Sequence, residues 1–188
     1  MKKYVIFSVL VLILNSCATF SKKMIKDDLS IITKENVSVI DGEYEFKGYE
    51  HINSGNQKSE KARSFAGMMD LNNNNISYCD KVVIKSKASH KRKKYELEFK
   101  LLKNDSIKYS FTYKGTLKNG LLTLSNYTSK CHGIPFLFGG CRSFQSRIGL
   151  TDQKNLLIQD YYDNSGAALF IMWAGYTINN AEKFKRIQ

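Results

Sequence analysis

The stretch KYELEFKL, residues 94–101, alternates strictly between apolar and charged side chains. Its tyrosine, two leucines and phenylalanine fall at every second position, and lysines and glutamates occupy the positions between them. Successive side chains of a β-strand point to opposite faces of the sheet, so this pattern predicts a strand with one buried face. The stretch therefore indicates a sheet that covers a hydrophobic core.

Similar alternation recurs along the chain at roughly ten-residue spacing, with turn residues between the runs. Residues 107–117 predict a long strand with a curl or bulge at Gly115, and the Asn119-Gly120 pair after it is typical of a two-residue hairpin turn. The other expected strands cover residues 42–49, 81–87, 94–101, 121–124, 142–150, 156–162, 167–176 and 183–187, with turns at 152–155 and 163–166.

These runs amount to about eight to ten antiparallel strands, and the sequence predicts no long helix that would cover a sheet. One short helix is expected at residues 64–69, after the first strand, where Phe65, Met68 and Met69 have helical spacing. An all-β fold closed into an up-and-down β-barrel satisfies the pattern best, because closure removes unpaired strand edges. We expect one such domain over residues 38–188.

The first 17 residues have the pattern of an export signal. Lys2 and Lys3 precede an apolar run at residues 4–14, which is shorter than the roughly 20 residues of a spanning helix. The run ends in LNSC, residues 14–17, which resembles the lipobox of bacterial lipoproteins. In that family the cysteine receives a diacylglyceryl group and becomes the acylated N-terminus after cleavage. An uncleaved anchor, or a chance cysteine behind an ordinary signal peptide, is the alternative.

The lipobox resemblance implies a signal peptide at residues 1–16, lipid attachment at Cys17 and a tether at residues 17–37. It places the protein in the bacterial cell envelope, bound to a membrane through its acyl chains. In the enterobacterial type, an aspartate after the cysteine retains the lipoprotein at the inner membrane. Ala18 stands at that position here. The expected location is therefore the outer membrane, facing the periplasm.

The order of features from residue 41 to 187 resembles the lipocalin-like, calycin-type barrels of small envelope lipoproteins. The shared features are an aromatic first strand, a short helix, a meander of hairpins, a Gly-Gly turn in PFLFGG (135–140) and the strand ALFIMWAG (168–175). The resemblance implies a barrel that binds a small apolar or amphipathic ligand. Lipocalins carry Gly-x-Trp where this chain has GEY (42–44), so the resemblance does not identify the ligand. The candidate ligand-lining residues are Tyr44, Phe46, Tyr95, Leu97, Phe99, Tyr109 and Phe111.

The alternative function is an envelope interaction protein of the inhibitor or immunity type, with a filled barrel and a basic face. A formal net charge of +12 indicates anionic partners. Export makes nucleic acid a poor candidate and leaves anionic lipid or glycan. The basic run at residues 85–94 carries the candidate contacts Lys91, Arg92 and Lys93 at an expected hairpin tip, which is alternatively a solvated turn without a partner.

Three cysteines follow Cys17, and two of them flank HGIPFLFGG, residues 132–140. We expect Cys131 and Cys141 to form a disulfide and Cys79 to stay reduced. A zinc site at Cys131, His132 and Cys141 is disfavoured, because adjacent ligands without a CxxC spacing suit a tetrahedral site poorly. No metal or cofactor is expected. The sequence contains no GxSxG, HExxH or Walker motif, so we do not expect an enzyme.

Overall fold

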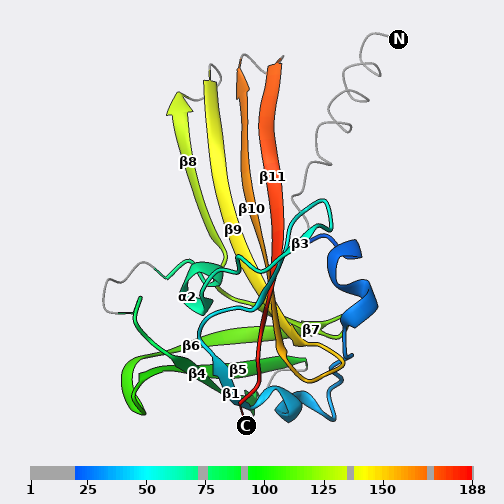
Figure 1. The fold of residues 1–188 in the computed structure, drawn as a ribbon. Coiled ribbons are helices and arrows are strands. Elements are labelled where there is room, and N and C mark those ends of the chain that lie inside the picture. Colours follow the sequence, from blue (N-terminus) through cyan, green and yellow to red (C-terminus); the bar gives the residue numbers. More distant parts are fainter. Residues whose placement is uncertain (1–19, 72–75, 90–92, 135–137, 169–171, 188) are drawn as a thin grey trace.

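The computed structural model describes residues 20–71, 76–89, 93–134, 138–168 and 172–187, which form mostly antiparallel β-structure (Figure 1). Eleven strands within these ranges join one sheet. The strands are β1 (Gly42–Glu45), β2 (Glu50–Ile52), β3 (Lys58–Ser59), β4 (Lys81–Ala88), β5 (Lys94–Lys103), β6 (Ser106–Lys118), β7 (Leu121–Leu124), β8 (Thr128–Ile134), β9 (Phe138–Leu150), β10 (Leu156–Ala168) and β11 (Met172–Phe184). The helical segments are the 3₁₀ turns η1 (Lys23–Asp28) and η2 (Val37–Ile40) and the α-helix α2 (Phe65–Met68).

The sheet is not closed into the barrel that the sequence predicted. The strand order is β1-β4-β5-β6-β7-β9-β10-β11-β2-β3, with β8 paired to β9 outside this path, so the path ends at β1 and β3. An isolated bridge between Tyr44 and Arg186 links β1 to the residues after β11. Beside it, the N–H of Glu45 donates to the carbonyl of Lys185 at 2.9 Å. The N–H of Ile187 likewise donates to the carbonyl of Glu43 at 2.8 Å, so β1 meets the chain after β11 through single bonds and an isolated bridge.

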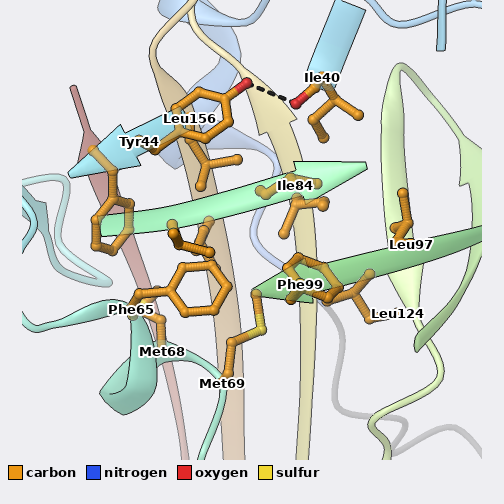
Figure 2. Close-up of a cluster of buried hydrophobic side chains, with 14 of the residues drawn as sticks. Ile40, Tyr44, Phe65, Met68, Met69, Ile84, Leu97, Phe99, Leu124 and Leu156 are labelled. Carbon is orange, nitrogen blue, oxygen red and sulfur yellow. Dashed lines mark hydrogen bonds between the residues drawn. The ribbon is translucent and has the colours of Figure 1, made fainter. Parts of the chain in front are cut away.

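The main core lies between strands β4 to β7 and the lower parts of strands β9 to β11, which run across them, and α2 packs beside it (Figures 1 and 2). Phe65 and Met68 of α2 and Phe99 of β5 are fully buried in this core. Tyr44 is also fully buried, and its hydroxyl donates to the carbonyl of Ile40 at 2.7 Å, as Figure 2 shows. Ser64 precedes α2 and accepts the N–H of Gly67, so a polar cap begins the short helix that the sequence predicted.

Three strands, β9, β10 and β11, run far beyond this core. Each has 13 residues, which corresponds to roughly 43 Å at the usual strand rise. The part beyond the core, which we call the blade, consists of β8 with residues 138–144, 162–168 and 172–178. Figure 1 shows the blade projecting past α2, away from the remaining strands, which we call the body.

The predicted turn at residues 163–166 is wrong, because β10 continues through it. The Asp163 carboxylate accepts hydrogen bonds from the hydroxyls of Ser165 at 2.9 Å and Thr177 at 2.6 Å, so the polar residues find partners within the sheet. A Cβ at Gly166 would lie 2.9 Å from the carbonyl oxygen of Gly139. The predicted Gly-Gly turn at 139–140 is also within a strand, β9. These glycines allow close approach of neighbouring strands.

The predicted hairpin turn at Asn119 and Gly120 is confirmed, since their φ angles are +53° and +78°. The predicted bulge at Gly115 is wrong. Gly115 pairs regularly with Tyr95 and Leu124. The register shift between β5 and β6 lies at Leu101 and Leu102, which pair with Tyr109 and Ile107.

Candidate functional site

The seven residues predicted to line a ligand cavity pack against one another and against the main core. Five are buried and two partly buried; the set is Tyr44, Phe46, Tyr95, Leu97, Phe99, Tyr109 and Phe111. The rings of Phe99 and Phe111 stack with centroids 5.0 Å apart, and Phe65 lies 5.7 Å from Phe99. None of the seven lines the hollows around Met24, Phe20 or Met69 on the described surface. The structure therefore brings these residues together in one hydrophobic core.

The structure places Cys131 and Cys141 opposite each other on β8 and β9 and joins them through a disulfide, with a Cα–Cα distance of 4.0 Å. This bond lies in the blade. Cys79 is a buried free thiol, and its burial raises its pKa. Within the described ranges, no group of three histidine, cysteine or acidic side chains is arranged to hold a metal ion.

The predicted lipid-attachment residue, Cys17, and two of the predicted anionic contacts, Lys91 and Arg92, lie outside the described residues. Lys93 is exposed between β4 and β5 with a φ of +60°, and its carbonyl accepts the N–H of Leu117 at 3.0 Å. The basic run therefore meets the end of β6. Across the described ranges, the chain forms no helix long and apolar enough to cross a membrane.

The first described residues, 20–29, pack on the outer face of β9 to β11. The N–H of Ser21 donates to the side-chain oxygen of Asn179 at 2.8 Å. Its carbonyl accepts hydrogen bonds from Gln159 at 2.8 Å and from Arg147 at 3.4 Å. Ser21 thus contacts β9, β10 and β11 together. The buried side chains of η1 and of Leu157 form a second, smaller apolar cluster beneath this segment. The expected tether at residues 17–37 is, from residue 20 onward, part of the folded domain.

Arg147 lies at the centre of the contact between residues 20–29 and the sheet, and its charge is buried. Its side chain is buried, with 7% of the residue exposed. Both Nε and Nη2 donate to the side-chain oxygen Oε1 of Gln159, at 2.8 and 2.5 Å, and the guanidinium carbon lies 4.5 Å from the centroid of the Phe20 ring. Among the described residues no carboxylate lies within ion-pair distance of it. Burial lowers the pKa of this guanidinium to about 10.

A surface hollow of about 420 Å³ opens beside Arg147, and we call it the basic hollow. Three of its lining side chains carry a positive charge, and no Asp or Glu lines it. The lining residues are Phe20, Lys22, Thr116, Lys118, Asn119, Thr123, Gln145, Arg147 and Tyr161. Lys22 and Lys118 are exposed. The Phe20 and Tyr161 rings meet edge to face at 4.9 Å. The hollow thus joins cationic groups with an aromatic wall.

A buried polar cluster lies on the opposite face of β10 and β11. Arg63 donates to Asp160 at 2.9 Å and to Glu182 at 3.1 Å, and His51 contacts Glu182 at 2.7 Å. Desolvation raises the pKa of Asp160, and this effect exceeds the opposing influence of Arg63 and Asn180. The cluster fastens the segment before α2 to the sheet. The cluster is a network of ion pairs with a structural role.

Sequence reasoning missed Arg147 and the packing of residues 20–29. Arg147 occupies an outward position of a predicted strand, where a charged residue is expected in any case. Its partners Phe20 and Gln159 are remote in sequence, so no local pattern links them. The available signal was the group of apolar residues Phe20, Met24 and Ile25 inside the presumed tether.

No protein-family model matches the chain, and no curated protein matches it either.

Proposed function

We propose that this chain is a lipid-anchored envelope protein that holds its filled β domain against a membrane and acts through surface contacts with anionic partners. The observation that carries the proposal is the packing of Phe20 on the sheet. Phe20 is three positions after Cys17, and three residues span at most roughly 11 Å. Acyl chains on Cys17 would therefore hold the outer face of β9 to β11 close to the lipid headgroups.

The charge distribution around this point supports an anionic partner. Lys22, Lys118 and Arg147 gather at the basic hollow. Lys93 of the basic run accepts the N–H of Leu117 in β6, one residue before Lys118. A basic residue near an anionic membrane surface contributes on the order of 1 kcal/mol. Anionic lipid, or an acidic glycan beside it, is the partner that this arrangement fits best. The proposed location is the periplasmic face of the outer membrane.

A second candidate function, binding of a small apolar ligand inside the β domain, has weaker support. It requires space among the aromatic residues, but those side chains pack against one another in the main core. The hydroxyl of Tyr44 is already bonded to Ile40, so it offers no free polar contact to a ligand. Native mass spectrometry of the purified chain separates the two candidates. A stoichiometric co-purifying small molecule would favour ligand binding.

The proposed anchor is tested by labelling cells that express the full chain with a fatty-acid analogue. We expect the wild type to be labelled and to fractionate with membranes, whereas Cys17→Ala is not labelled. Cys79→Ala is the matched control, because it removes a different thiol and leaves the lipobox intact. Equal labelling of wild type and Cys17→Ala would contradict the proposal.

A further inference from the structure

Arg147 carries a buried charge for which the described residues supply no counter-ion. Burying a cation costs several kcal/mol unless an opposite charge or a set of hydrogen bonds compensates it. Gln159, Ser21 and the Phe20 ring supply neutral partners for Nε, Nη2 and the guanidinium face. Within the described residues no hydrogen bond involves Nη1. The guanidinium thus retains both its charge and a donor at the wall of the basic hollow.

Further donors surround the same space because of the strand register. Thr116 of β6 pairs with Thr123 of β7, which pairs with Arg147 of β9, so the three side chains share the outer face of the sheet in one row. Lys118 lies two residues along the same face of β6, and Lys22 approaches from the docked N-terminal segment. Two threonine hydroxyls, two ammonium groups and a guanidinium therefore line one hollow, and no carboxylate is among its lining groups.

We propose that the basic hollow binds a phosphate group, held by Arg147, Lys22 and Lys118. Guanidinium and ammonium groups form the stronger, charge-assisted hydrogen bonds with phosphate oxygens, and the hydroxyls add neutral ones. The phosphate has two possible sources, the headgroup of an anionic phospholipid or a free phosphate ion. The headgroup is the source that rests on the proposed function, since Phe20 lines the hollow three residues after the lipid-attachment position.

The test titrates the purified full chain, ¹⁵N-labelled in a nonionic detergent, and follows the Nε–H resonance of Arg147 by NMR. The probes are dihexanoylphosphatidylglycerol, inorganic phosphate and dihexanoylphosphatidylcholine. We expect a saturable shift with phosphatidylglycerol, a weaker one with inorganic phosphate and none with phosphatidylcholine, whose choline group is repelled by the lysines. Tighter saturation by inorganic phosphate than by phosphatidylglycerol would assign the site to the free ion and overturn the headgroup as its source.

Two matched variants report on the site itself. Lys22→Gln/Lys118→Gln changes two exposed side chains and is expected to raise the half-saturating concentration on the order of tenfold. Lys61→Gln/Lys108→Gln removes the same charge from exposed positions outside the hollow and is expected to leave it unchanged. Thermal melts verify that both variants fold. No saturable shift with either anion, or equal weakening by both variants, would overturn the proposal. Absent labelling at Cys17 would contradict the lipid anchor alone, because the titration does not depend on it.

Discussion

At the scale of single residues, Phe99 is a central packing residue of the main core. It is fully buried and contacts the rings of Phe65, Phe111 and Tyr113. We expect Phe99→Ala to lower the free energy of unfolding by about 3–5 kcal/mol, because it removes a buried ring and leaves a cavity. Phe111→Ala is expected to cost less, since Phe111 is only partly buried. Chemical denaturation measures both.

Ile107→Ala is the control for these substitutions, because Ile107 is 56% exposed on β6 and its loss is expected to change stability by no more than about 0.5 kcal/mol. If Phe99→Ala were as silent as Ile107→Ala, the inward register of β5 would be wrong.

Asp160 is predicted to make the protein less stable as pH rises. Its pKa is raised above the ordinary value of 3.8 chiefly by desolvation, so the folded state binds its proton more tightly than the unfolded state does. The free energy of unfolding therefore falls as pH rises from about 3.8 through the raised pKa. Asp160→Asn removes this dependence. We expect the stability of the variant relative to wild type to increase between about pH 3 and about pH 7, measured by urea unfolding.

Asp152→Asn, at an exposed turn position, is the comparison for this titration and is expected to follow the wild type. A difference between Asp160→Asn and wild type that does not vary with pH would contradict the prediction.

At the scale of elements, β8 depends on a single neighbour. It pairs with β9 and with no other described strand, and the Cys131–Cys141 bond closes the loop between them over a sequence separation of 10. We expect Cys131→Ser/Cys141→Ser to lower the free energy of unfolding by about 2–3 kcal/mol in the chain-entropy picture. The rate of amide hydrogen exchange should then increase more in β8 than in β5.

Thiol counting checks the same bond independently. In the unfolded, unreduced full chain carrying Cys17→Ala, we expect one free thiol, that of Cys79. Three free thiols would exclude the disulfide.

The sequence predicted β4 to β7 of the body well, missed the short strands β2 and β3, and predicted the blade poorly, for a physical reason. In β5 one face meets the core and the other meets solvent, so burial imposes the alternation seen in residues 94–101. The described blade residues from 162 to 167 are partly exposed on both faces, so no such alternation marks them. Asp163 and Gly166 therefore resembled a turn, although the first bonds to Thr177 and the second allows close strand contact.

The sequence predicted a basic surface but not the basic hollow, since no described residue of the run 85–94 lines it. Clustered lysines in residues 85–94 indicated a basic surface, whereas the position of Arg147 beside Phe20 depends on a contact between residues 127 positions apart. Such a contact leaves no periodic trace in the sequence.

At the scale of the whole molecule, the basic run and the hydrophobic core are expected to be separable. Charge reversal at Lys91, Arg92 and Lys93 should change stability by no more than about 0.5 kcal/mol, as surface substitutions usually do. It should weaken binding of the unacylated Cys17→Ala chain to vesicles rich in phosphatidylglycerol, and the difference should shrink as salt is added. Thermal melts and vesicle co-sedimentation measure the two effects.

The same reversal at Lys34, Lys61 and Lys108, which are exposed outside the basic hollow, is the control for net charge. If the reversals at Lys91, Arg92 and Lys93 unfolded the protein while Phe99→Ala left its stability unchanged, the assignment of these residues to surface and core would be wrong.

If the chain is processed at Cys17 as we propose, the docking of Ser21 across three strands has a consequence for the order of cleavage and folding. A protease that cuts before Cys17 must bind the chain around that position in an extended form, yet Phe20 and Ser21 are held on the sheet by β9, β10 and β11. Cleavage and docking therefore compete for the same few residues. The fold would be completed at its N-terminal edge only after the signal segment has been removed, so that the last step of folding and the last step of processing coincide.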